Sequence, residues 1–99
     1  MARTPSETAE LICTAMDKLN EQKVITRFQM SLKGIGLLAQ RELVDQGYLF
    51  MLSTELITRG WCMFQVSHTS YSLIRHESAI KFRKLSSDQL LSAISGEKL

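Results

Sequence analysis

Apolar residues recur at helical spacing near the start of the chain. Four of them lie three, four and three positions apart: Ala9, Ile12, Met16 and Leu19. This spacing places them along one face of an amphipathic helix. The preceding Thr4-Pro5-Ser6-Glu7 has the composition of a capping box, with proline in the first turn and a carboxylate three residues after the threonine. We therefore expect a helix from Pro5 to about Glu21.

Residues 24–32 change to a two-residue period. Phe28, Met30 and Leu32 alternate with polar residues, and a β-branched run precedes them at positions 24–26. Alternation and β-branching both favour a strand. The same residues would also allow an apolar helix face, so a helix is the alternative that this short segment leaves open.

A helical pattern follows the glycines at positions 34 and 36. Its apolar residues are Leu37, Leu38, Ala39, Leu43 and Val44. Gly47 then stands where a left-handed residue would end a helix. The next six residues, YLFMLS at 48–53, form an apolar run of strand length. We expect a helix that ends at Gly47 and then a strand, while residues 54–60 stay open between loop, helix and hairpin.

A hairpin is predicted in the second half of the chain. Two alternating segments flank the polar residues SHTS: WCMFQV at 61–66 and YSLIR at 71–75. Four residues are a common loop length for a hairpin. Such a loop would pair Val66 with Tyr71 and Phe64 with Leu73, so that Cys62 points inward with them.

The last two predicted elements are a strand and a helix. AIKFRK at 79–84 alternates again, with Lys81 and Arg83 on its outward face. Ser86 and Gln89 have the spacing of a second capping box, and Gly96 follows a short apolar stripe. The sequence thus predicts the α+β class, in the order α-β-α-β-β-β-α, with helices packed on a small, mainly antiparallel sheet. We expect residues 1–99 to form a single compact domain.

Composition agrees with a globular protein that has no membrane anchor. The chain has 99 residues, of which 44% are hydrophobic and 22% charged. No apolar run reaches the roughly 18 residues that a transmembrane helix needs, and the first residues lack the apolar core of a secretory signal. Cys13 and Cys62 belong to no C-x-x-C motif. We expect two reduced thiols and a cytoplasmic protein.

Positive charge is concentrated in residues 57–84. The whole chain carries +2, but this segment has five cations against Glu77 alone, a net charge of +4. The candidate partner-binding residues are these cations: Arg59, Arg75, Lys81, Arg83 and Lys84. Such a cluster suits nucleic-acid phosphates, an acidic protein surface, or simply contact with water.

The reactive residues form no recognisable catalytic or metal-binding pattern. Cys62 and His68 would lie at opposite ends of the predicted strand, too far apart to act as a thiol and its base. Two histidines and two cysteines scattered along the chain lack the spacing of a metal site. The KGIG segment matches neither of the usual phosphate-binding glycine motifs. We therefore expect no enzyme activity, no metal and no cofactor.

Two classes of function fit these observations. The first is a small non-enzymatic interaction or regulatory protein, an inhibitor, adaptor or modulator of bacterial or phage style. It would bind a macromolecular partner, most simply a protein, with nucleic acid as the other candidate. Exposed strand edges would also allow a homodimer.

The second class comes from a resemblance. ITRFQMSLKGIGLLAQRELVDQGYLFML at 25–52, followed by the predicted hairpin, resembles winged-helix DNA-binding regulators. The resemblance implies that the second helix of a pair enters the major groove and that the hairpin contacts phosphates. The helix expected within residues 35–47 carries Arg41 against Glu42 and Asp45, which complements DNA poorly. The winged-helix regulator is therefore the alternative function.

Overall fold

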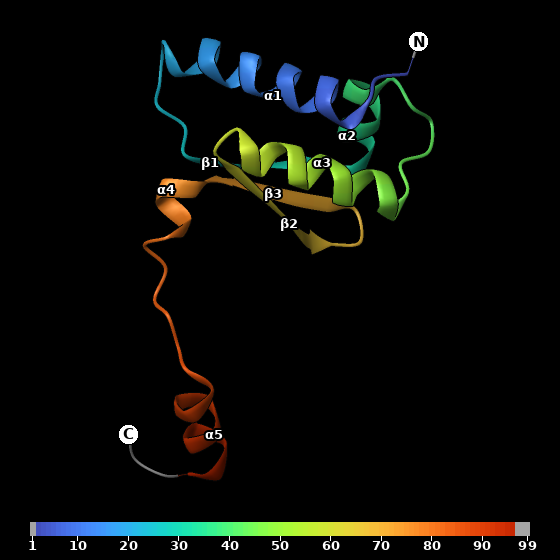
Figure 1. The fold of residues 1–99 in the computed structure, drawn as a ribbon. Helices are drawn as coiled ribbons and strands as arrows, with labels where there is room; N and C mark the ends of the chain where they lie inside the picture. Colours follow the sequence, from blue (N-terminus) through green and yellow to red (C-terminus); the bar gives the residue numbers. More distant parts are fainter. Residues whose placement is uncertain (1, 97–99) are drawn as a thin grey trace.

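The computed structural model describes residues 2–96, in which five helices and three strands are present (Figure 1). In chain order they are α1 (Pro5–Asn20), β1 (Arg27–Ser31), α2 (Leu32–Ala39), α3 (Gln46–Thr58), β2 (Trp61–Ser67), β3 (Ser70–Arg75), α4 (His76–Ala79) and α5 (Ser87–Ser95). The α+β class, the small antiparallel sheet and the helices at both ends of the chain are confirmed.

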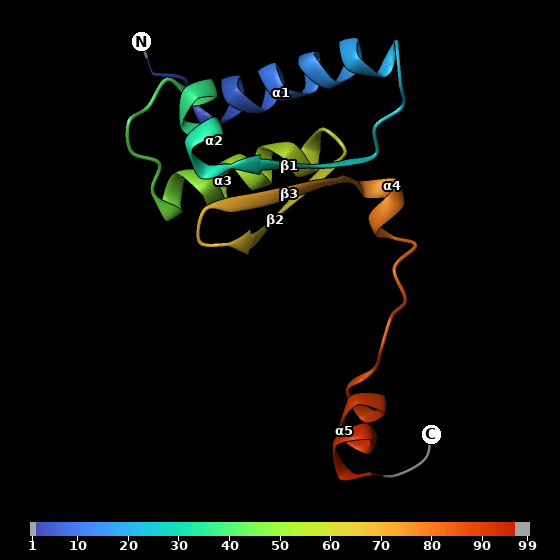
Figure 2. The ribbon, with the colours of Figure 1, turned by 180° about the vertical axis from the view of Figure 1, so that it is seen from behind.

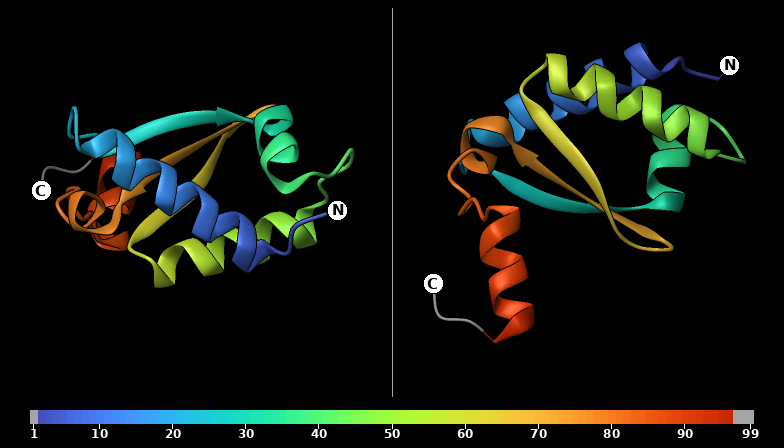
Figure 3. Two further views of the ribbon diagram at one scale, coloured as in Figure 1. Left: turned by 90° about the horizontal axis from the view of Figure 1, so that it is seen from above. Right: turned by 60° about the horizontal axis from the view of Figure 1, so that its bottom comes forward.

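The three strands form one antiparallel sheet in the order β1-β3-β2, so β3 is central (Figure 2). Helices α1 and α3 lie over the same face of this sheet, as the two views of Figure 3 show. The core lies between these helices and the sheet. Its buried residues are Ala9, Ile12, Met16, Ile35, Ala39, Tyr48, Leu49, Leu52, Leu56, Trp61, Tyr71 and Leu73. Among the described residues, 2–96, no comparable helix layer covers the opposite face of the sheet (Figure 1).

The first helix and first strand form as their local patterns predict. The Glu7 amide donates to Thr4 Oγ1 at 3.1 Å, and the Thr4 amide donates to Glu7 Oε1 at 3.0 Å, which completes the capping box. Residues 24–26 precede the strand, which spans Arg27–Ser31. Ser31 ends β1 and also caps α2, because its hydroxyl accepts from the Gly34 amide at 2.9 Å.

The prediction of a helix that ends at Gly47 is wrong. Helix α2 covers Leu32–Ala39, and Gln40 adopts a left-handed conformation with φ of 55°. The loop then folds back so closely that a Cβ on Gly36 would lie 2.9 Å from the Arg41 carbonyl oxygen. Asp45 starts a new helix by accepting from the Tyr48 amide at 2.7 Å. Gly47 is therefore in the first turn of α3 and ends nothing.

The prediction of a strand at 48–53 is also wrong, because these residues form the first half of α3. Its buried residues, Tyr48, Leu49, Leu52 and Leu56, have helical spacing. That spacing is hidden in the sequence because Phe50 and Met51, which are exposed, are equally apolar. Residues 54–58 continue the helix, and Gly60 with φ of 89° reverses the chain into β2.

The predicted hairpin exists, but its register is shifted by one residue. The turn contains two residues, His68 and Thr69, and an irregularity falls at Val66. Phe64 is consequently opposite Ser72, while Leu73 is opposite Met63. The inward-facing residues of β2 are therefore Trp61 and Met63. Cys62, Phe64 and Val66, expected inward, do not belong to the core cluster.

The strand expected at 79–84 is absent from the described chain. Residues 76–79 form α4 instead, and residues 80–86 are exposed without regular structure. The physical reason is topological: β3 already has a neighbour on each side, so a following segment cannot pair with it. Helix α5 forms with its predicted cap at Ser86 and ends at Gly96, but none of its residues is buried. Figure 1 shows α5 standing apart from the rest of the chain.

A buried polar group links the chain start to α3. The hydroxyls of Thr8 and Tyr48 lie 2.6 Å apart, and Thr8 is fully buried. Tyr48 also donates to the Arg3 carbonyl oxygen at 3.2 Å, and the Arg41 guanidinium lies 4.5 Å from the Tyr48 ring centre. These contacts hold the N-terminal segment, the α2–α3 loop and α3 in one arrangement.

Candidate functional site

The five cations predicted as one partner-binding face are divided by the structure. Arg59, at the end of α3, is committed to internal contacts. Its Nη1 lies 2.8 Å from Glu55 Oε2, and its Nη2 donates to Ser6 Oγ at 3.2 Å. Arg75, at the end of β3, lies over the Trp61 ring at 4.9 Å from the ring centre. Both arginines therefore hold the body of the protein together.

The other three cations stay together in the segment between α4 and α5. Lys81, Arg83 and Lys84 are all exposed. Lys81 and Arg83 do not share the face of a strand, because no strand forms there. Phe82 lies between them and is also exposed. These three charges therefore lie on an irregular segment and not on the sheet, where the sequence pattern had placed them.

The outward face of α3 is a surface that the sequence did not reveal. Phe50, Met51 and Ile57 expose 73%, 57% and 57% of their area. With Gly47, Thr54 and Thr58, they form a stripe along the side of the helix that points away from the core. We call this stripe the α3 face. Residues 46–58 contain no lysine or arginine and one acidic residue, Glu55.

A hollow of about 640 Å³ lies between α2, the loop at 40–45 and Thr69 in the hairpin turn. Its apolar lining is contributed by Leu32, Leu37, Leu43 and Val44. Leu37 and Leu43 are largely exposed. The hollow and the α3 face thus each group several exposed apolar side chains, whereas large exposed apolar side chains are normally scattered singly.

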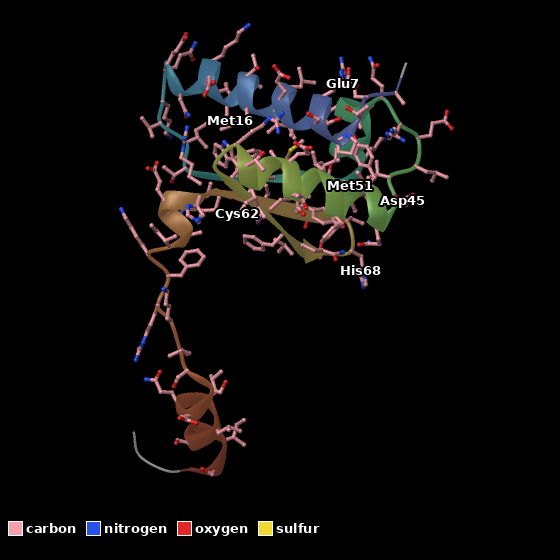
Figure 4. The ribbon with its side chains drawn as sticks, viewed as in Figure 1. Glu7, Met16, Asp45, Met51, Cys62 and His68 are labelled. Carbon is pink, nitrogen blue, oxygen red and sulfur yellow. The ribbon has the colours of Figure 1, made fainter. Side chains whose placement is uncertain are left out.

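The sulfur and imidazole groups are not assembled into a reactive site. Cys62 is the second residue of β2, and His68 lies in the turn at the far end of that strand, as Figure 4 shows. Cys13, on α1, packs against the core, and burial raises the pKa of its thiol. Both cysteines are unpaired. Within residues 2–96, no group of three or more His, Cys, Asp and Glu residues is arranged to hold a metal ion.

In the part of the chain from residue 2 to residue 96, no helix has the length and apolar character needed to cross a membrane. No protein-family model matches the chain, and no curated protein or solved structure matches it either.

Proposed function

We propose that this protein is a small non-enzymatic regulatory protein that acts by binding a partner protein through the α3 face. The observation that carries the proposal is the exposure of Phe50, Met51 and Ile57 on one side of a single helix. Large apolar and aromatic side chains that project together are typical of the centre of a protein interface. A helix with such a stripe fits a groove in a partner, or provides a platform for a partner helix.

Charge supports a protein partner over DNA at this face. DNA binding depends on neutralising phosphates with lysine and arginine. The α3 segment has a net charge of −1 and no cation, and the adjacent Arg59 is paired with Glu55. Two unpaired cysteines are consistent with a cytoplasmic location, which forms part of this proposal.

A winged-helix DNA-binding regulator is the second candidate, and the topology favours it. The order α1-β1-α2-α3-β2-β3 and the strand order β1-β3-β2 resemble those of a winged-helix domain, with α3 as the second helix of the pair and β2–β3 as the wing. Fold alone does not define function, however, because one fold carries many different binding sites. The composition of α3 is the reason for ranking this candidate second.

Affinity capture with the tagged full-length chain tests the proposal. Phe50→Glu and Ile57→Glu place charges on the α3 face and are expected to abolish capture of one specific protein from lysate of the source cells. Val24→Glu is the matched control, because Val24 is 73% exposed, as Phe50 is, but lies outside α3. A partner that is lost equally with the control variant, or retained by both α3 variants, would contradict the proposal.

Two further measurements separate the alternatives. Light scattering reports whether the chain self-associates, and a dimer that Phe50→Glu dissociates would identify a second copy as the occupant of the α3 face. Titration of a fluorescent DNA duplex with the protein at low salt measures duplex affinity and so tests the winged-helix candidate. Tight duplex binding that Phe50→Glu abolishes would favour the winged-helix function instead.

A further inference from the structure

The face of the sheet opposite the helices carries a second surface. A hollow of about 260 Å³ lies there, and the residues that matter for its chemistry are Arg27, Gln29, Phe64, Ser72 and Phe82. Four of them come from three adjacent strands, where alternation places them on the outer face. Phe82 reaches the hollow from the segment after α4. The Phe64 and Phe82 side chains are 49% and 58% exposed, so two aromatic rings border an open depression.

Four cations belong to the depression or to the residues next to Phe82 in the chain. Arg27 lines it, and Lys81, Arg83 and Lys84 flank Phe82 along the chain. All four cations are exposed. In residues 2–96, the one ion pair is that of Arg59 with Glu55, so none of these four cations is neutralised by a carboxylate. Glu77 and Asp88 are the acidic residues nearest to them in sequence, four positions from Lys81 and from Lys84.

We infer that this surface binds single-stranded nucleic acid. Bases stack on exposed aromatic rings whatever their sequence, and lysine and arginine beside the rings bind the phosphates. Gln29 and Ser72, which also line the hollow, offer hydrogen bonds to base edges. A duplex is disfavoured because its bases are already stacked inside the helix, where Phe64 and Phe82 do not reach them.

The inference is independent of the α3 face, because the two surfaces share no residue and are built from different elements. A chain with both would connect a partner protein to a single-stranded nucleic acid. The cations recognised in the sequence thus have a role only in combination with Phe64, which the predicted register placed in the core.

Fluorescence anisotropy with a labelled 12-nucleotide single strand, as DNA and as RNA, tests the inference over a range of salt concentrations. Replacing Lys81, Arg83 and Lys84 together by glutamine is expected to reduce the slope of log K against log salt by about 2, since each phosphate contact contributes roughly 0.7. Phe82→Leu keeps an apolar side chain but removes the ring, and is expected to weaken binding about 5- to 150-fold, the range for loss of one stacked base. Lys18→Gln with Lys23→Gln is the control, because both residues are exposed on or just after α1.

Several outcomes would overturn the inference. The first is the absence of binding to either single strand near 50 mM salt. The second is an affinity for a 12-base-pair duplex equal to that for the single strand. The third is a loss of affinity in the control variant equal to the loss in the variant at Lys81, Arg83 and Lys84. Polyglutamate should not compete efficiently. If it competes as well as unlabelled strand, and Phe82→Leu binds normally, the surface recognises an acidic protein instead. Phe50→Glu should leave nucleic-acid binding unchanged, which keeps this test separate from that of the α3 face.

Discussion

Replacing Leu52 and Phe50 separately by alanine gives a sharp test of how α3 is oriented. Leu52 is fully buried, and Phe50 is 73% exposed. Truncating a fully buried leucine costs about 2–5 kcal/mol, so we expect Leu52→Ala to lower the free energy of unfolding by about 3 kcal/mol. In a domain of this size that loss lowers the melting temperature by about 12–24 °C.

Phe50→Ala should cost far less, although phenylalanine is the larger residue. Only about a quarter of Phe50 is covered, and full burial of its side chain contributes about 1.5–3 kcal/mol. The loss of roughly 0.5 kcal/mol is offset by the better helix propensity of alanine. We therefore expect a change within about 0.5 kcal/mol.

Urea denaturation followed by circular dichroism and by the fluorescence of Trp61 measures both variants. Trp61 is the single tryptophan and is buried, so its emission reports unfolding directly. The comparison also distinguishes helix from strand, because residues two apart share a face in a strand and lie on nearly opposite sides of a helix. Equal costs for the two variants would refute the orientation of α3 and, with it, the α3 face.

Three further predictions concern other parts of the fold. Gly36→Ala should destabilise the protein by about 1–3 kcal/mol, because its Cβ would lie 2.9 Å from the Arg41 carbonyl oxygen; an unchanged urea midpoint would exclude that close approach. Tyr48→Phe should cost about 1–2 kcal/mol, because it leaves the buried Thr8 hydroxyl without its partner at 2.6 Å; wild-type stability in this variant would mean that Thr8 is satisfied elsewhere. Hydrogen bonds from Thr4 lower the pKa of Glu7, so its stabilising contribution is present above the ordinary value of 4.5 and is lost as pH falls through the lowered pKa. The difference in melting temperature between wild type and Glu7→Gln should therefore shrink as the pH is lowered, and a pH-independent difference would contradict this.

Elements whose signals are local were predicted correctly. The caps at Thr4 and Ser86 depend on side chains within three residues of the amides they bind, so α1 and α5 can be read from short segments. The alternation of β1 and of the hairpin strands is local in the same way. The positions of the three cations around Phe82 also follow from the sequence.

Tertiary structure decided the remaining features. YLFMLS is apolar at nearly every position, so either a helix or a strand could bury part of it, and only packing against α1 and β2 selects the helix. The hairpin register depends on a two-residue turn with an irregularity at Val66, which reverses the faces of Cys62 and Phe64. The central place of β3 excluded the last predicted strand.

The sequence by itself determined where helices are capped, where apolar and polar residues alternate and where charge is concentrated, because neighbouring residues carry those signals. The α3 face and the depression between Phe64 and Phe82 were decided by tertiary structure, because each depends on which apolar residues the core leaves uncovered.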